Sequence, residues 1–109
     1  MGAIPILCSV IGEDAAGNEF LGLMASSGLP IEGIVSSTHR QTTRKNRVIS
    51  GGHHLLRIDE EEDQSLNKEE QKLLKTRVLE IIKDCDAIIM EDYDKGCLDQ
   101  LLISEIIEE

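Results

Sequence analysis

Residues 86–98 read Asp-Ala-Ile-Ile-Met-Glu-Asp-Tyr-Asp-Lys-Gly-Cys-Leu, and this stretch decides the fold. Its apolar run, Ala87–Met90, is typical of a strand buried on both faces of a parallel sheet. Three carboxylates follow where that strand should end, on Glu91, Asp92 and Asp94. Because open α/β sheets bind ligands at the carboxyl ends of their strands, the carboxylates form a candidate site. Alternatively, they solvate a loop and cap the next helix, and position alone does not decide between the two interpretations.

The rest of the chain predicts strands that alternate with helices, as in an α/β protein. Strands are expected over residues 4–11 and 31–37, and helices over residues 15–26, 68–83 and 97–109. Gly28 is a suitable end for the first helix. Asn67 and Glu70 form the pattern of a capping box at the start of the second. These strands are too few to enclose Ala87–Met90, so we expect residues 1–109 to be an internal part of a larger domain.

A β-hairpin is expected from strands over residues 42–50 and 53–59, joined by the turn Gly51-Gly52. With a regular ladder, Asn46 would lie opposite Arg57 and share its face. The other face would then carry Lys45 and Arg47, together with Ile49, Leu56 and Ile58.

Charge is distributed unevenly along the 109 residues, whose net charge is −10. Such an acidic chain is not expected to bind nucleic acid, which needs a basic surface. Between Glu32 and Asp59, however, no acidic residue occurs, and the segment contains five arginine and lysine residues and three histidines. This basic island predicts a site for a small anion such as phosphate, and the alternative is a solvated pair of strands. Its members are Arg40, Arg44, Lys45, Arg47 and Arg57.

No metal centre, disulfide framework or membrane span is expected. The three cysteines show no Cys-x-x-Cys spacing, and this usage fits a reducing cytoplasm. His53 and His54 are adjacent, so in a strand they point to opposite faces and cannot easily share one ion. The segment Gly12–Gly17 lacks the Gly-Lys-Ser/Thr of a phosphate-binding loop. No run of about 18 apolar residues occurs.

The ordered motifs resemble those of the ribokinase-like (PfkB-type) carbohydrate kinases, and most of all the heptose-7-phosphate kinases. This group includes the kinase half of bifunctional ADP-heptose synthases. Three motifs carry the resemblance. The first motif, Thr-x-Lys-x-Arg-Val, is matched by Thr43, Lys45, Arg47 and Val48. The second, Leu-x-Arg-x-Asp-x-Glu, is matched by Leu55 or Leu56 with Arg57, Asp59 and Glu61. The third, Asp-Tyr-x-Lys-Gly, is matched by Asp92, Tyr93, Lys95 and Gly96. Glu91 and Asp94 depart from the pattern, because the family usually has small residues there.

The resemblance implies a partial ribokinase-like, Rossmann-like three-layer fold with a hairpin lid. It also implies a cytoplasmic enzyme that transfers phosphate from ATP, with Mg²⁺, to a sugar or sugar phosphate on the ADP-heptose route of lipopolysaccharide core synthesis. The implied substrate-binding residues are Asp92, Arg57, Asn46, Lys45, Arg47 and Lys95, and a homodimer through the lid is a further implication. Lys95 would either approach a phosphate or pair with Asp92.

Two family segments are absent from the sequence, the early Gly-Gly-x-x-x-Asn and the late Gly-Ala-Gly-Asp that carries the catalytic base. No catalytic residue is therefore expected in this chain, and alone it should be inactive. The alternative is a non-catalytic α/β binding or assembly module complete at 109 residues. An acidic regulatory protein that binds a basic partner is a third interpretation, and it rests on net charge alone.

Overall fold

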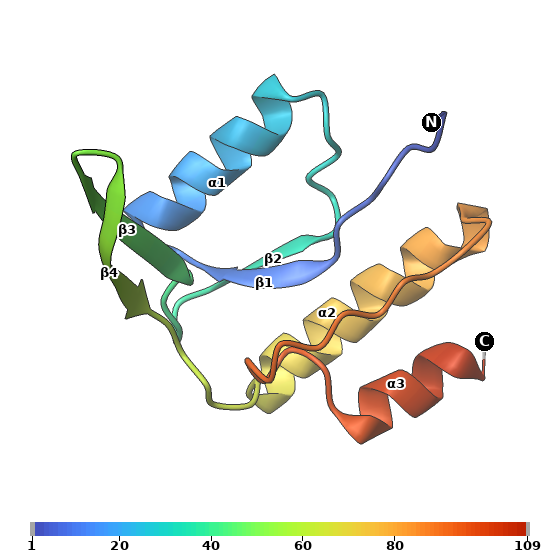
Figure 1. Cartoon of the computed structure of the whole chain (residues 1–109). Coiled ribbons are helices and arrows are strands. Elements are labelled where there is room, and N and C mark those ends of the chain that lie inside the picture. Colours follow the sequence, from blue (N-terminus) through green and yellow to red (C-terminus); the bar gives the residue numbers. More distant parts are fainter. Residues whose placement is uncertain (1, 109) are drawn as a thin grey trace.

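Two short parallel strands form the centre of the structure, a computed structural model that describes residues 2–108. β1 (Ser9–Gly12) pairs with β2 (Ile34–Ser37), with Val10 beside Val35. Helix α1 (Ala15–Ser26) connects them and lies against one face of the pair. Helices α2 (Lys68–Ile81) and α3 (Gln100–Ile107) lie on the other face (Figure 1). The chain is thus an α/β protein, and its elements form three layers.

Each face of this small sheet has its own core. Side chains alternate along a strand, so neighbours on β1 point to opposite sides. Ile11 and Ile34 pack with Met24 under α1. Val10 and Val35 face the opposite way and pack with side chains of α2 and α3. That larger cluster is completed by Leu66, Leu74, Val78, Leu102 and Ile106.

Helix α1 spans the predicted residues, whereas α2 begins at the predicted residue and ends earlier, and α3 begins later and ends earlier than predicted. Asn67 Oδ1 accepts from the N–H groups of Glu69 and Glu70, and the Glu70 carboxylate accepts from the N–H of Asn67, so the predicted capping box is confirmed. A 3₁₀ turn, η1 (Ile82–Asp84), follows α2 within the predicted helix. The last helix is shorter than predicted because Asp99 is its N-cap, accepting from Leu102 N–H at 2.7 Å. Glu109, the predicted end, lies outside the described residues.

The prediction of a buried strand at Ala87–Met90 is wrong for this structure. The segment is extended but unpaired, with Ile88 47% and Ile89 87% exposed. Within residues 2–108, the two sheets have two strands each, and neither offers this segment a partner. The first predicted strand is likewise unpaired before Ser9, where Ile4 is 83% exposed.

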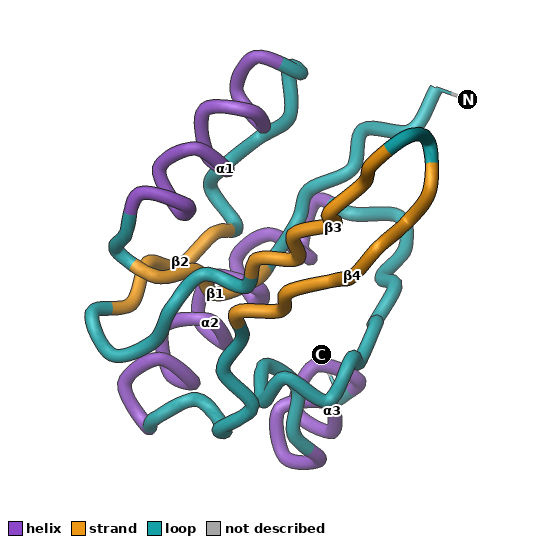
Figure 2. The backbone as a smooth tube through the Cα atoms, turned by 60° about the vertical axis from the view of Figure 1, so that its left-hand side comes forward, coloured by secondary structure: helices purple, strands orange, loops and turns teal. Residues whose placement is uncertain are grey.

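The hairpin stands beside the layers as a separate two-stranded sheet (Figure 2). β3 (Arg44–Ser50) pairs antiparallel with β4 (His53–Glu60). Gly51 and Gly52 have φ of 56° and 79°, as the predicted two-residue turn requires. The predicted turn is therefore confirmed, although both strands are exposed along their whole length.

Candidate functional site

A β-bulge in the hairpin overturns the predicted face assignment. The ladder is regular from the turn to the pair Ile49–His54, but the next pair is Val48–Leu56, so Leu55 is an extra residue. Arg47 therefore lies opposite Arg57 and shares its face.

Asn46 and Lys45, like Arg47, lie on the opposite side of the hairpin from the one predicted relative to Arg57. Asn46 lies opposite Ile58, on the face away from Arg57. Lys45 lies opposite Asp59, on the same face as Arg57. A single extra residue causes this difference, because side chains change face at every step along a strand.

The two faces of the hairpin differ in chemistry. One face, here called the basic face, carries Lys45, Arg47 and Arg57. The other, the apolar face, carries Val48, Leu56 and Ile58, which are 39–49% exposed. On the basic face, Arg57 Nε donates to both oxygens of Asp59, at 2.8 and 3.0 Å. Like charges directly opposite each other disfavour a strand pair, so the Arg47–Arg57 pair is suited to an anion that bridges it.

A hydrogen-bonded cluster fixes the start of the hairpin to the carboxyl end of β1. Asp14 caps α1 by accepting from Gly17 N–H at 2.7 Å, and it also accepts from the N–H and the hydroxyl of Thr42, both at 2.8 Å. The Thr42 hydroxyl accepts in turn from Gly12 N–H at 2.9 Å. The hydrogen bonds from the Thr42 N–H, the Gly17 N–H and the Thr42 hydroxyl lower the pKa of Asp14.

The glycines of this cluster have a structural role. A Cβ on Gly12 would lie 2.9 Å from the Thr42 nitrogen, and one on Gly17 would overlap the Gly12 carbonyl. The close packing in this cluster thus accounts for the glycines at positions 12 and 17, and no bound phosphate is needed to explain them. Sequence reasoning did not connect Asp14 to Thr42, which lies 28 residues further on.

Asp92, the principal predicted sugar contact, lies on an exposed turn. Its Oδ1 accepts from Asp94 N–H at 2.8 Å, and Asp94 has a positive φ of 56°. Both residues and the neighbouring Glu91 are exposed to solvent. No hydrogen bond or ion pair connects Asp92 to Arg57 or Lys95 within residues 2–108. The carboxylate therefore remains available to accept further hydrogen bonds.

Lys95 pairs with the acidic segment that follows β4. Its Nζ lies 2.8 Å from Glu61 Oε1 and 2.7 Å from Asp63 Oδ1. The hydrogen bonds that Lys95 donates to the carboxylates of Asp63 and Glu61 raise the pKa of Lys95 well above its ordinary value. Of the two alternatives predicted for Lys95, the pairing with Asp92 is therefore not the one that the structure has, because its partners are Glu61 and Asp63. The second oxygen of Glu61 lies 3.7 Å from Lys45 Nζ, so one carboxylate links the basic face to the turn that carries Asp92.

A buried carboxylate, that of Glu70 on α2, contacts the carboxyl end of β2. Glu70 is 6% exposed and Ser37 4%. The Ser37 hydroxyl donates to Glu70 Oε1 and accepts from His39 N–H at 2.9 Å. Burial raises the pKa of Glu70, but the hydrogen bonds from Ser37 and Asn67 and the nearby Arg40 outweigh it, so the net pKa is lowered. Sequence reasoning placed Glu70 in the capping box but did not connect it to Ser37.

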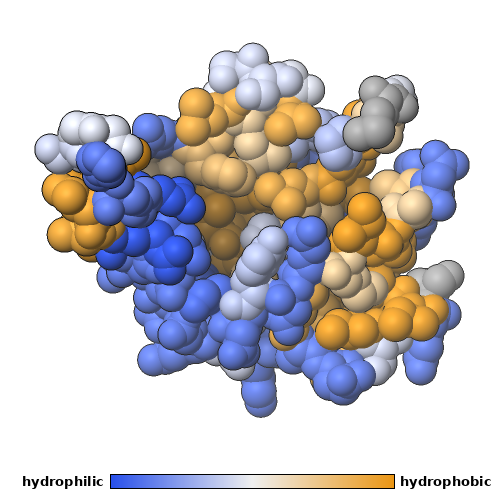
Figure 3. Space-filling view, in the orientation of Figure 1, coloured by the Kyte–Doolittle hydropathy of each residue, from blue (hydrophilic) through white to orange (hydrophobic). Residues whose placement is uncertain are grey.

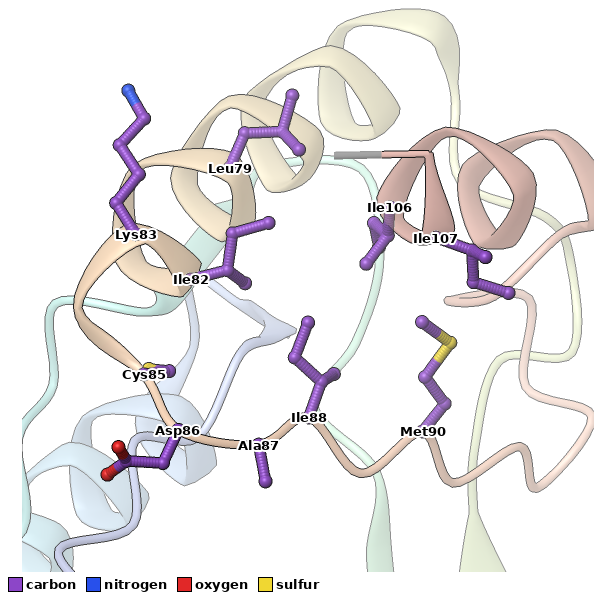
Figure 4. A pocket seen from close by; sticks show the side chains of 10 residues that line it. All are labelled: Leu79, Ile82, Lys83, Cys85, Asp86, Ala87, Ile88, Met90, Ile106 and Ile107. Carbon is purple, nitrogen blue, oxygen red and sulfur yellow. The ribbon is translucent and has the colours of Figure 1, made fainter.

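A groove lies away from these polar groups. It has a volume of about 640 Å³ and runs between α2, the unpaired segment and α3 (Figure 4). Ile88, Met90 and Ile106 point into it, whereas Lys83 and Asp86 point away. Apolar side chains also gather across the upper and right-hand parts of the face shown in Figure 3. Most of the residues that line the groove are apolar, and Lys83 and Asp86 stand at one end of it with their side chains directed away.

No helix among the described residues combines the length and the apolar character needed to cross a membrane. Residues 2–108 also contain no group of three or more His, Cys, Asp or Glu side chains placed to hold a metal ion.

The structure is thus an α/β segment with a charged hairpin at the carboxyl ends of its parallel strands. No protein-family model matches the chain. Its homologues are bifunctional HldE proteins, which confirms the relationship predicted from the motifs. The protein of Wolinella succinogenes is 34% identical over 101 residues, which is 93% of this chain and 21% of the relative.

Two further relatives show the same extent of similarity. The HldE protein of Helicobacter pylori is 35% identical over 93% of the chain and 22% of its own length. That of Methylobacillus flagellatus is 36% identical over 94% of the chain and 21% of its own length. The chain therefore spans about a fifth of the length of these relatives.

Proposed function

We propose that this chain is an internal part of the carbohydrate kinase domain of an HldE-like protein. The parent transfers the γ-phosphoryl group of ATP to a sugar phosphate, heptose-7-phosphate, on the cytoplasmic route to ADP-heptose. The observation that carries this proposal is the similarity to HldE proteins over 93% of the chain, in a region that contains all three kinase-like motifs. Alone, the chain is proposed to be inactive, because the Gly-Ala-Gly-Asp segment is not among its residues.

The proposed role of the chain is to hold the sugar phosphate. Asp92 accepts hydrogen bonds from sugar hydroxyls, since an ionised carboxylate is an acceptor only. Arg47 and Arg57 bind the phosphate of the substrate, because guanidinium groups match phosphate oxygens in geometry and charge. Lys45 adds charge on the same face. Asn46 is directed to the apolar face and would contact the sugar only from that side.

ATP and Mg²⁺ do not fit the described residues. No group of three or more His, Cys, Asp or Glu side chains placed to hold a metal ion is present within residues 2–108, and Asp14 already accepts from the Gly17 N–H at the start of α1. Acidic residues at this helix start also disfavour a bound phosphate. The proposal therefore assigns ATP and its metal to other parts of the parent, and no step through them is derived from this chain.

Kinase activity of a parent protein that contains this segment tests the proposal, with Asp92→Asn as the informative variant. The parent should phosphorylate heptose-7-phosphate, and the variant should lower kcat/KM for the sugar about tenfold to a hundredfold, the range expected for hydrogen bonds to a charged group. The KM for ATP should not change. Glu91→Gln, which alters the neighbouring exposed carboxylate, is the control and should retain activity. A parent that phosphorylates only nucleosides would overturn the heptose assignment.

The apolar face of the hairpin is proposed to cover the same face of a second copy. An isolated pair of strands is only marginally stable in water. The apolar side chains of this hairpin are exposed on Val48, Leu56 and Ile58, and a second copy that covers them would stabilise it. Leu56→Lys should therefore shift the parent from dimer to monomer in sedimentation equilibrium. Leu73→Lys, at a 54% exposed position on α2, is the control and should leave the dimer intact. A wild-type parent that is monomeric at all concentrations would contradict this proposal.

A further inference from the structure

Three segments that are distant in the sequence meet at the base of the hairpin. They are residues 40–43 before β3, residues 61–63 after β4, and the turn 92–96 before α3. Figure 1 shows the loop that follows β4 descending to that turn. Arg40 Nη2 donates to the carbonyl oxygens of Glu62 and Lys95, at 3.1 and 2.9 Å. One guanidinium group thus holds the backbone of two of these segments together.

The side chain of Lys95 makes the second connection. Its ammonium group bonds Glu61 and Asp63, both of which directly follow β4, and its side chain is only 28% exposed. Glu61 also contacts Lys45, which stands on β3. Both strands of the hairpin are therefore connected to the turn through one ammonium group and one shared carboxylate.

Backbone packing holds the same turn in place. Leu66 N–H donates to the carbonyl of Gly96 at 3.1 Å. A Cβ on Gly96 would lie 2.7 Å from the Cα of Ser65, and its φ of 73° favours glycine. Lys95 therefore projects from a rigid position, and its bonds to Glu61 and Asp63 can transmit the position of the turn to the hairpin.

We propose that Lys95 is a positioning residue that couples the orientation of the hairpin to the turn that carries Asp92, through Glu61 and Asp63. We assign it to positioning and not to phosphate binding, because two carboxylates bind its single ammonium group, whereas Arg57 contacts Asp59 through Nε alone and keeps its other donors. The coupling is a property of this chain alone, and only its consequence for substrate binding rests on the proposed function. Movement of the hairpin then alters the turn, and a ligand that fixes Asp92 also fixes the hairpin.

Amide hydrogen exchange of a parent protein that contains this segment, in the absence of substrate, tests the coupling. Lys95→Met removes the ammonium group and keeps the length of the side chain. Exchange of the amides of β3 and β4 and of the turn 92–96 should accelerate about tenfold, because local opening is no longer opposed by charge-assisted hydrogen bonds. Exchange in α2 should not change. Lys95→Arg should restore slow exchange, since it keeps the charge and the donors.

Matched variants make the result decisive. Lys72→Met removes a charge from an exposed position of α2 and should leave exchange in the hairpin unchanged. If Lys95→Met does not fold, Glu61→Gln provides the second test, with a smaller effect in the same two segments. Equal acceleration in α2 would show general destabilisation and would overturn the proposal. Exchange in the wild-type hairpin as fast as in an unstructured peptide would also overturn it.

An added titration with inorganic phosphate separates the two roles of Lys95. If Lys95 binds phosphate directly, Lys95→Met should bind inorganic phosphate more weakly, and amide exchange in the hairpin should be unchanged. A positioning residue shows the reverse, faster exchange in the absence of phosphate. Because neither readout uses catalysis, the proposed kinase function and the coupling can fail independently.

Discussion

Replacing Glu70 by Ala is expected to lower the free energy of unfolding by about 2–4 kcal/mol, the combined effect of a lost helix cap and a buried hydroxyl without its acceptor. Glu70 contacts both the N–H of Asn67 and the hydroxyl of Ser37, so it joins α2 to the end of β2. Urea denaturation followed by circular dichroism measures the change. Glu69→Ala is the matched control, because this neighbouring acid is exposed and its loss affects only the helix dipole.

The same carboxylate should make the fold sensitive to acid. Its pKa is lowered in the folded state from an ordinary value of 4.5, so it stabilises the fold fully above that value. This contribution is lost as pH falls through the lower, folded-state pKa. At pH values below about 4.5, the urea concentration at the unfolding midpoint of the wild-type chain should therefore decrease as the pH is lowered. The dependence of this midpoint on pH should be weaker in Glu70→Gln. Equal slopes, or equal effects of the Glu69 and Glu70 substitutions, would contradict the role given to Glu70.

Replacing both Arg47 and Arg57 by Met in a parent kinase should lower kcat/KM for heptose-7-phosphate about a hundredfold, as expected for lost charge-assisted phosphate contacts. Activity toward the same sugar without its phosphate should change little. The hairpin itself should be little destabilised, because the substitution removes two like charges that lie opposite each other and costs only one partly exposed ion pair, Arg57–Asp59. Steady-state kinetics with the two sugars, together with thermal unfolding, measure both effects.

Arg44→Met is the control for this experiment. Arg44 stands on the face opposite Arg47 and pairs with Glu60 at 3.7 Å. Its replacement should preserve kcat/KM for the phosphorylated sugar. A loss as large as that of the double variant would mean that net charge near the site, rather than the basic face, determines binding.

Local sequence signals predicted the elements whose determinants lie within a few residues. Asn67 and Glu70 mark the start of α2 because both members of the capping box lie in one turn. Gly51 and Gly52 identify the hairpin turn because few other residues accept positive φ in succession. The parallel pairing of β1 with β2 follows the expected strand–helix–strand order.

Features that depend on distant partners were not predictable in this way. Ala87–Met90 has the composition of a buried strand, but strand formation needs a neighbour that residues 2–108 do not supply. The contact between Lys95 and Glu61 spans 34 residues, and that between Ser37 and Glu70 spans 33. The bulge at Leu55 has no glycine or other local signal, yet it decides which side chains share a face with Arg57.

The bulge also has a consequence for how this hairpin could vary during evolution. Loss of the codon for Leu55 would leave the pairs Val48–Leu56 and Ile49–His54 adjacent in a regular ladder, with every charged residue on its present face. Loss of a codon elsewhere in a strand, between the bulge and the base of the hairpin, would instead move the residues on one side of the lost position to the opposite face of the hairpin. Position 55 is thus the place where the length of the hairpin can change by one residue while its charge pattern is inherited intact.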